Sequence, residues 1–237
     1  MKRSRKLGCI VISILLLSLA VPLLSAEPDP WLRQREQMVR EQMEARGIRD
    51  PLTLQAMGSV PRHLFVPPEL LDAAYRDTPL PIGFGQTISQ PYMVATMTEI
   101  IRPRPGQKIL EVGTGSGYQA AVLAACGAEV YSIEIIPALA ERAGNQLKTL
   151  GYRINGRTSD GFFGWPEAAP FDAIQVTAAA EFIPPPLTEQ LKEGGTMVIP
   201  VGTPFHLQTL MLVEKRNEQL HTRSLMPVRF VPLRRTE

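Results

Sequence analysis

Cysteine and histidine are scarce in this chain. Its 237 residues include two cysteines and three histidines. Cys9 lies in the apolar N-terminal segment, so Cys126 is left without a partner for an intramolecular disulfide or a cysteine-based zinc site. The histidines, which are His63, His206 and His221, are not spaced as metal ligands are. The sequence therefore predicts a protein that binds no metal.

The chain also lacks an excess of positive charge. Its formal net charge is +2, but residues 1–26 hold four basic side chains and no acidic one, which leaves two more acidic than basic side chains in residues 27–237. Nucleic-acid-binding proteins typically carry a basic excess, so no nucleic-acid partner is expected. With 44% hydrophobic and 20% charged residues, the composition is that of a globular protein with an apolar core.

Residues 1–26 have the pattern of an export signal. The basic start KRSRK is followed by an apolar run from Leu7 to Leu24, and then by the small residues Ser25 and Ala26 in front of a polar segment. The alternative is an uncleaved membrane anchor, because the run approaches the length that spans a bilayer. In both cases the rest of the chain would cross the membrane. These residues therefore predict an exported, periplasmic protein.

Residues 27–106 are expected to form a helical N-terminal lobe within a single domain that spans residues 27–237. Helices are expected at residues 31–46 and 51–57. Residues 79–88 contain two glycines and two prolines, which predicts a loop. This lobe is expected to contribute the residues that bind the substrate.

From residue 107 to residue 237, short apolar strands alternate with helices. Alternation of this kind is typical of an α/β protein with a doubly wound, Rossmann-like parallel sheet that has helices on both faces. Two further strands are expected at residues 207–215 and 221–233, separated by the turn sequence RNEQ. They predict antiparallel strands at one edge of the sheet.

A run of polar side chains precedes a helix near residue 91. The helix is indicated by an apolar face with helical spacing, formed by Met93, Val94, Met97, Ile100 and Ile101. The polar residues in front of it are Gln86, Thr87, Ser89 and Gln90. A helix N-terminus needs only one capping hydroxyl. Either this run is an extended cap, or its side chains hold a ligand.

A glycine turn follows the first strand of the expected sheet. The order strand, glycine loop, helix lets backbone N–H groups and a helix N-terminus approach a ligand. The spacing is GxGxG, with Gly113, Gly115 and Gly117, whereas the dinucleotide fingerprint needs its third glycine at the position of Tyr118. GxGxG resembles motif I of the S-adenosylmethionine-dependent methyltransferases, and the resemblance extends to Glu111 in the preceding strand. These residues are therefore expected to bind the cofactor.

Two acidic residues stand at the ends of the next two strands. Glu134 follows the glycine turn by about 20 residues, where a carboxylate can accept both ribose hydroxyls of a nucleoside. Asp160 and Gly161 follow where a third strand would end, so that the carboxylate can meet an adenine amino group while the glycine lets the backbone approach the ring. Alone, Glu134 could be a solvent-facing strand end and Asp160-Gly161 a turn. Together with the glycine turn they predict a nucleoside site.

From residue 31 onward the chain resembles the protein-L-isoaspartate (D-aspartate) O-methyltransferases along essentially its whole length. The matching stretches are VPRHLFVP, LPIGFGQTISQPYMVATMTE, ILEVGTGSGYQAAVLA, DGFFGWPEAAPFDAIQVTAAA, LTEQLKEGGTMVIPVG and VRFVPL. The resemblance implies transfer of a methyl group from S-adenosyl-L-methionine to the free α-carboxyl of L-isoaspartyl and D-aspartyl residues in damaged proteins and peptides, by a monomer without a metal. Residues 1–26 depart from the pattern of this family, because its members typically begin near the first helix and are cytoplasmic.

The resemblance also assigns roles within the polar run. It implies that Ser89 occupies the active-site serine position, that Thr87 and Gln86 bind substrate beside it, and that Gln90 and Met93 lie against the cofactor. The chemistry agrees, because a carboxylate has a pKa of about 4 and is already an anionic nucleophile at neutral pH. Catalysis then needs alignment and the removal of water, not a strong base. Ser89 is therefore expected to hydrogen-bond the substrate carboxylate and not to attack it.

Other functions remain as alternatives. The nearest is a methyltransferase of the same fold that acts on another carboxylate or small molecule. Amino methylation of nucleobases would want an Asn/Asp-Pro-Pro-aromatic motif where this chain has residues 177–180, and carbon methylation of cytosine would need a cysteine nucleophile, whereas Cys126 is expected to be packed at a helix end. An NAD-dependent oxidoreductase is disfavoured by Tyr118. A non-catalytic binding module is the last alternative.

Overall fold

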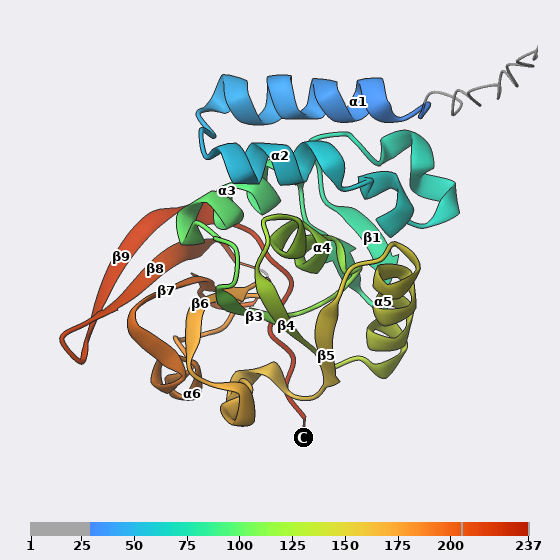
Figure 1. The fold of residues 1–237 in the computed structure, drawn as a ribbon. Coiled ribbons are helices and arrows are strands. Elements are labelled where there is room, and N and C mark those ends of the chain that lie inside the picture. Colours follow the sequence, from blue (N-terminus) through green and yellow to red (C-terminus); the bar gives the residue numbers. More distant parts are fainter. Residues whose placement is uncertain (1–28, 205, 237) are drawn as a thin grey trace, which may run out of the picture.

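The computed structural model describes residues 29–204 and 206–236, which fold around a seven-stranded sheet (Figure 1). Its strands are β3 (Lys108–Val112), β4 (Glu129–Glu134), β5 (Ile154–Thr158), β6 (Phe171–Val176), β7 (Leu191–Val201), β8 (Gln208–Arg216) and β9 (Gln219–Val228). In space they are ordered β5-β4-β3-β6-β7-β8-β9, with β3 to β7 parallel to one another and β8 and β9 each antiparallel to the preceding strand. The predicted doubly wound sheet with antiparallel C-terminal edge strands is confirmed. The leader expected at residues 1–26 lies outside the described residues.

Helices cover both faces of the sheet. They are α1 (Leu32–Gln37), α2 (Pro51–Ser59), α3 (Pro91–Ile101), α4 (Tyr118–Ala125), α5 (Pro137–Thr149) and α6 (Pro185–Glu189). On β3, Ile109 belongs to an apolar cluster shared with α2, α3, α4 and α5. The neighbouring residues Leu110 and Val112 belong to a second cluster, which includes Leu187 of α6. Because successive strand residues point to opposite faces, the two clusters are the two sides of the sheet.

The antiparallel edge is closed by a tight turn between β8 and β9. Lys215 pairs with Leu220 and the turn residues Asn217 and Glu218 both have positive φ angles, of 52° and 61°. Two consecutive positive φ values are typical of the turn type that matches the twist of a hairpin. The RNEQ turn predicted from the sequence is therefore present.

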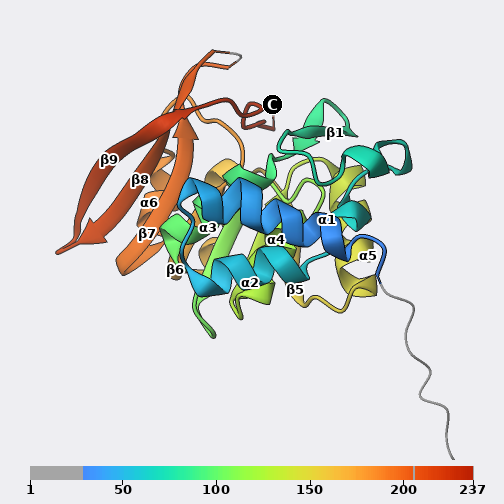
Figure 2. The same cartoon turned by 90° about the horizontal axis from the view of Figure 1, so that it is seen from above.

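The helix expected at residues 31–46 is present but irregular. α1 continues into a π-helical segment, Met38–Met43, and then into a 3-10 turn, Glu44–Arg46. The chain leaves this turn at Gly47, whose φ of 96° is left-handed and favours glycine. Seen from above, α1 lies over the helical layer beside α2 (Figure 2).

The loop predicted at residues 79–88 is wrong, because the structure has a hairpin there. β1 (Leu80–Gly83) pairs antiparallel with β2 (Gln86–Ile88). The glycine signal belongs to a two-residue turn in which Phe84 and Gly85 have φ angles of 55° and 70°. Proline is tolerated on such an edge strand, so it did not exclude one. The hairpin places the first residues of the polar run on a strand.

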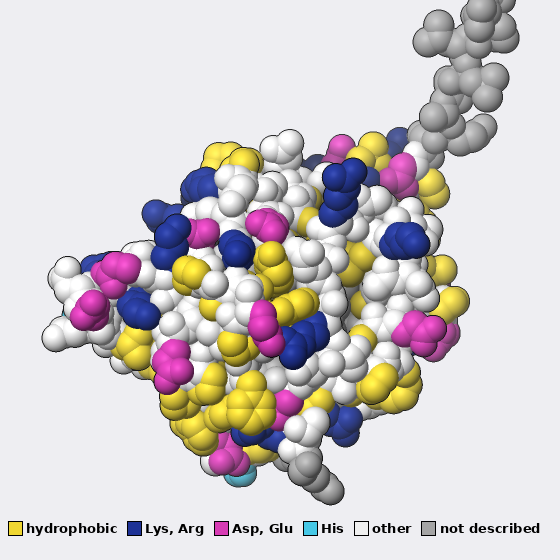
Figure 3. Space-filling model, turned by 60° about the horizontal axis from the view of Figure 1, so that its bottom comes forward, with side chains coloured by type: hydrophobic (Ala, Val, Ile, Leu, Met, Phe, Trp, Pro, Cys, Tyr) yellow, Lys and Arg dark blue, Asp and Glu magenta, His cyan; other side chains and the backbone are white. Residues whose placement is uncertain are grey.

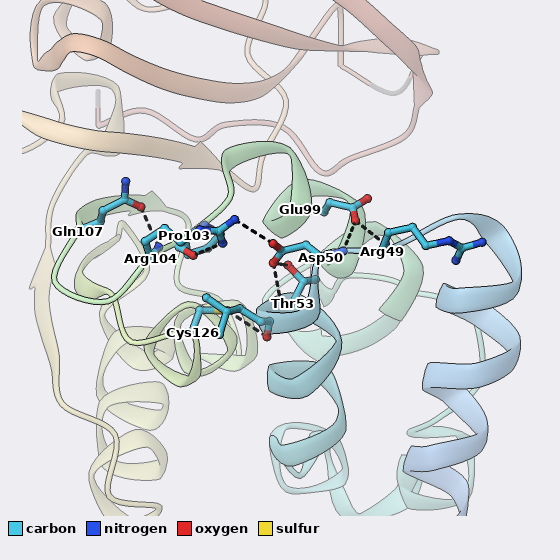
Figure 4. Close-up of polar contacts among 9 residues, drawn as sticks. Arg49, Asp50, Thr53, Glu99, Pro103, Arg104, Gln107 and Cys126 are labelled. Carbon is cyan, nitrogen blue, oxygen red and sulfur yellow. Dashed lines mark hydrogen bonds and ion pairs between the residues drawn. The ribbon is translucent and has the colours of Figure 1, made fainter.

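The N-terminal lobe is joined to the sheet by polar contacts at the start of α2 (Figure 4). Asp50 caps α2 by accepting the Thr53 N–H at 2.9 Å, and it also accepts Arg104 Nη2 at 3.1 Å. Glu99 of α3 accepts the backbone N–H groups of Arg49 and Asp50 at 2.6 and 2.7 Å. These bonds fix α2 and α3 to the loop in front of β3.

Within residues 29–204 and 206–236, no helix is both long and apolar enough to cross a membrane.

Candidate active site

The glycine turn after β3 is fixed by backbone contacts to the strands on both sides. The Gly113 N–H donates to Ile133 O at 2.8 Å, and the Thr177 N–H donates to Val112 O at 2.9 Å. Gly113 has a φ of +99°, and a side-chain carbon at this position would lie 2.4 Å from Thr177 Oγ1. Gly117, also left-handed, begins α4. The turn therefore requires glycine and presents its backbone at the carboxyl end of the sheet.

Glu134 ties this turn to the end of β4. Its Oε2 accepts the Gly115 N–H at 2.8 Å, and its Oε1 accepts the Ile136 N–H at 3.0 Å. The side chain is only 6% exposed. Because a carboxylate offers about four acceptor positions, Glu134 can hold the turn and still accept the hydroxyls of a sugar.

Two cavities meet at the polar run. A narrow one, of about 50 Å³, is lined by Gln86, Thr87, the glycine turn, Glu134, Gly161 and the C-terminal residues 231–234. A cleft of about 370 Å³ adjoins it and is lined by Thr87, Ser89, Gln90, Met93 and residues 227–231. Thr87, Thr177 and Val231 line both. Of the residues predicted to bind the nucleoside, Gly113, Gly115, Glu134 and Gly161 line the narrow cavity, whereas Gly117 and Asp160 line neither space.

Ser89 does not cap α3. The N-cap position is Gln90, and no side chain there makes a capping hydrogen bond. Instead, the carboxylate of Asp77 accepts Gln90 Nε2 at 2.8 Å and the Tyr92 N–H at 3.4 Å. Thr87 and Ser89 both line the cleft, and neither hydroxyl is used to cap α3. The described contacts therefore do not support the hypothesis that the polar run is an extended cap of α3.

Gln90 and Met93 lie at the cleft and not at the narrow cavity. The side chain of Gln90 is engaged by Asp77, both through its carboxylate and through its carbonyl oxygen at 3.2 Å. These contacts hold Gln90 in place at the entrance to α3.

Glu111 lies beneath the glycine turn and does not line either cavity. It is 0% exposed and accepts a short hydrogen bond from Ser132 Oγ. Its Oε1 has no partner among the described residues, and neither has the side-chain amide of Gln175, which neighbours Glu111 on β6. Burial raises the pKa of Glu111 to about 8. The carboxyl is therefore mostly protonated at neutral pH.

Asp160 is engaged by the C-terminal segment. Its Oδ1 accepts the Phe162 N–H at 3.0 Å, while its Oδ2 accepts Arg235 Nε at 2.9 Å and the Thr236 N–H at 3.2 Å. Burial would raise the pKa of Asp160, but these hydrogen bonds outweigh it and hold the pKa below its ordinary value. Next to it, a side-chain carbon on Gly161 would lie 2.4 Å from Val112 Cγ1, so glycine is required there too.

Known proteins identify the family of this chain. A family model described as protein-L-isoaspartate(D-aspartate) O-methyltransferase (PCMT) matches residues 33–237. A protein-L-isoaspartate O-methyltransferase of Opitutus terrae is 60% identical over 203 residues, which cover 85% of this chain and 87% of that protein. The chain belongs to the protein-L-isoaspartate(D-aspartate) O-methyltransferase family. Another relative, protein-L-isoaspartate O-methyltransferase 2 of Syntrophobacter fumaroxidans, is 52% identical over 242 residues, or 97% of this chain and 98% of that protein.

Solved structures of family members share the fold. A protein-L-isoaspartate O-methyltransferase with 28% identity superimposes with a TM-score of 0.77 over 84% of this chain and 65% of its own length. A Plasmodium falciparum chain assigned to the same family, in complex with S-adenosyl-L-homocysteine, has 27% identity and a TM-score of 0.74 over 84% of this chain and 98% of its own.

Sequence reasoning missed two contributors to this methyltransferase site. Thr177 directly follows β6, and its Oγ1 donates to Gly113 O at 2.7 Å, so it supports the glycine turn from the side of β6. In the sequence, a hydroxyl residue directly after an apolar strand was the pattern that could have indicated this role. Residues 231–234 line the narrow cavity, but no local pattern marks them, because their contacts are with residues far away in the sequence.

The surface beside the C-terminal segment is partly apolar. Phe162 packs edge-on against Phe163 and Phe182, and the Arg235 guanidinium lies 3.6 Å from the centre of the Phe162 ring. Phe163 and Phe182 are more than half exposed. Figure 3 shows the face that carries the C-terminal end, where apolar side chains gather among charges of both signs.

Cys126 is a packed side chain, as predicted. It is 2% exposed, and burial raises the pKa of its thiol to about 12. Within the described part of the chain, no three His, Cys, Asp or Glu side chains are grouped as metal ligands would be.

Proposed function

We propose that this family member transfers a methyl group from S-adenosyl-L-methionine to the free α-carboxyl of L-isoaspartyl and D-aspartyl residues in damaged proteins and peptides. When bound, S-adenosyl-L-methionine supplies an electrophilic methyl group on a sulfonium sulfur and leaves as S-adenosyl-L-homocysteine. The product on the substrate is a methyl ester.

The composition of the cleft is the observation that carries this proposal. Among the described residues, its polar side chains are the hydroxyls of Thr87, Ser89 and Thr177, the amide of Gln90 and the guanidinium of Arg229, without a carboxylate or an imidazole. Such a set can accept an anionic substrate and offers no strong base. A carboxylate nucleophile needs none, because it is ionised at neutral pH.

The substrate carboxylate is assigned to the hydroxyls of the polar run. Ser89 and Thr87 donate hydrogen bonds that orient the carboxylate, with Gln86 beside them on β2. Neutral donors suit this role, since they position an oxygen without neutralising its charge. Holding the nucleophile in line at the junction of the two cavities supplies the rate enhancement by orientation and by exclusion of water.

The cofactor is assigned to the glycine turn and the adjoining strand ends. Gly113, Gly115 and Gly117 let the backbone approach it, Glu134 accepts the ribose hydroxyls, and Asp160 with Gly161 meets the adenine. Gln90 and Met93 form the side that faces the substrate, and Glu111 supports the turn from beneath.

The narrow cavity is too small for this cofactor as it stands. It holds about 50 Å³, whereas ligand pockets are typically about 300 Å³ or more. The residues fit the group, because the backbone of Gly113, Gly115 and Gly161 and the carboxylate residue Glu134 line this cavity. The wall opposite the glycine turn consists of Gln86, Thr87 and residues 231–234. The cofactor is therefore assigned to the narrow cavity together with the adjoining part of the cleft, where Gln90 and Met93 lie.

Transfer of tritium from labelled S-adenosyl-L-methionine tests the function. We expect label in a peptide that contains isoaspartate, and none in the matched aspartyl peptide, in small carboxylic acids or in nucleic acid. Label in a small acid but not in the isoaspartyl peptide would favour the alternative substrate class.

Substituting the serine tests its assigned role. Ser89→Ala should lower kcat strongly, by about 100-fold from the loss of orientation, and leave the melting temperature nearly unchanged. The hydroxyl makes no capping bond whose loss would destabilise α3. An unchanged rate would contradict the assignment.

The leader and the assembly state complete the proposal. Residues 1–26 are proposed to direct export, with a cytoplasmic location as the alternative, and the protein is proposed to act as a monomer without a nucleic-acid partner. Cell fractionation with sequencing of the mature N-terminus distinguishes the locations. A cytosolic protein that starts after residue 26 would rule export out.

A further inference from the structure

A buried arginine lies directly behind the polar run. Arg62, in the 3-10 turn Arg62–Phe65, is 0% exposed. Its Nη2 donates to the carbonyl oxygen of Ser89 at 2.8 Å, and its Nε donates to Ala74 O at 2.7 Å. The guanidinium stands over the ring of Tyr118, with 4.9 Å to the ring centre. The guanidinium thus contacts three segments of the chain, which are represented by Ala74, Ser89 and Tyr118 of α4.

Stability alone does not account for this arginine. Among the described residues no carboxylate forms an ion pair with Arg62, and its Nη1 has no hydrogen-bond partner. Burial lowers the pKa of Arg62 to about 10, so the side chain is still charged at neutral pH. Burying a charge without an opposite charge is unfavourable, so the two hydrogen bonds to backbone carbonyls are obtained at a cost in desolvation.

We propose that Arg62 is a positioning residue that holds Ser89 in its reactive orientation, an inference that rests on the proposed function. The backbone before Ser89 is fixed by the pairing of Ile88 with Leu80, and the residue after it is tethered to Asp77. The bond from Arg62 fixes the carbonyl between these two anchors. It thereby restrains the backbone dihedral angles of Ser89, and with them the direction of the Cα–Cβ bond that carries its hydroxyl.

The chemistry of the side chain explains why arginine is used. Its planar fork can donate to the carbonyl oxygens of Ala74 and Ser89 at the same time and with fixed geometry. A lysine ammonium is a single point on a flexible stem and is more strongly hydrated. Arg62→Lys therefore keeps the charge but loses the rigid connection.

The test is Arg62→Lys, assayed for methylation of an isoaspartyl peptide. We expect kcat to fall at least tenfold, because a small misplacement of an orienting group is costly. The dissociation constant of S-adenosyl-L-homocysteine should stay within twofold, because Arg62 does not line the narrow cavity. A purely structural role would lower the melting temperature without this selective loss of kcat.

Arg35→Lys is the matched control. Arg35 is also buried in the lobe, at 7% exposure, and its Nε donates to Gly58 O at 2.7 Å. Its other partners are Tyr75 and Asp29, and none of them belongs to the polar run. The same substitution there should lower the melting temperature while kcat stays within twofold of the wild type.

A double variant shows whether Arg62 acts through the serine. Arg62→Lys combined with Ser89→Ala should have the same kcat as Ser89→Ala alone, within twofold, because the hydroxyl to be positioned is gone. If Arg62→Lys is insoluble, Arg62→Gln replaces it with the same expectations, since an amide can still donate but cannot connect both carbonyls.

The outcomes separate this inference from the proposed function. A wild-type protein that does not methylate the isoaspartyl peptide would overturn the function. An active wild type whose Arg62 variant keeps kcat within twofold, or whose Arg35 variant loses as much, would overturn only the positioning role. If the losses of kcat from the two single substitutions multiply in the double variant, the positioning role of Arg62 is overturned as well.

Discussion

Replacing Glu111 by glutamine should make the protein more stable at neutral and alkaline pH. Glutamine has the shape of the protonated acid and can still accept the hydrogen bond from Ser132. The carboxyl is fully buried, and its pKa is raised by that burial to about 8, from 4.5 for an ordinary glutamate. Ionisation inside the fold is therefore unfavourable, and the variant removes the group that would ionise.

The size of the effect follows from the two pKa values of Glu111. Below pH 4.5 the carboxyl is protonated in both the folded and the unfolded chain, so it contributes nothing. Between pH 4.5 and 8 the unfolded chain has released the proton while the folded chain keeps it, so the free energy of unfolding falls by about 1.4 kcal/mol per pH unit. From pH 5.5 to 7.5 the wild type should lose about 2–3 kcal/mol relative to Glu111→Gln, which corresponds to roughly 5–10 °C in melting temperature.

The assay is urea unfolding of the cofactor-free protein at half-unit steps from pH 4 to 9. The informative quantity is the difference between variant and wild type at each pH, because contributions from other titrating groups cancel in it. Glu36→Gln, which removes a carboxylate at an exposed position of α1, is the matched control for the loss of a glutamate side chain. Parallel curves for the wild type and Glu111→Gln between pH 5.5 and 7.5 would refute the reasoning.

Three further predictions concern the turn, the C-terminal segment and the lobe. Gly113→Ala should weaken binding of S-adenosyl-L-homocysteine at least tenfold in calorimetry, because its side chain would lie 2.4 Å from a hydroxyl, whereas Gly144→Ala, which meets nothing within 4 Å, should bind normally and raise the stability by about 0.5 kcal/mol. Arg235→Ala should tighten the same ligand by up to about fivefold, since it removes one of the hydrogen bonds that occupy Oδ2 of Asp160; weaker binding would show that the arginine helps to hold the ligand instead. Glu99→Gln should lower the unfolding free energy by about 1–2 kcal/mol, since it weakens two backbone hydrogen bonds, and an unchanged urea midpoint would contradict this.

Local sequence patterns predicted the parallel sheet and its antiparallel edge. Hydrophobic periodicity and turn residues involve only a few neighbouring residues, so they can be recognised in the sequence alone. The β1–β2 hairpin was missed because the same glycines serve a loop and a two-residue turn equally well. Only burial of Leu80, Ile82 and Ile88 distinguishes them, and that depends on the core they meet.

The placement of individual site residues depended on the distance of their partners along the chain. Glu134 contacts Gly115, 19 residues away, within the strand-turn-helix unit that sequence motifs describe. Asp160 contacts Arg235, 75 residues away, and the bond from Arg62 to Ser89 connects two segments without a shared motif. Such contacts arise from the packing of whole elements and leave no local signal.

The shared wall of the two cavities has a consequence for substitutions. Thr87 and Val231 border both the narrow cavity and the cleft. Under the proposed function, the methyl donor and the peptide would contact the same two residues from different sides. A change at Thr87 or Val231 would then alter the binding of both ligands together and not of one alone.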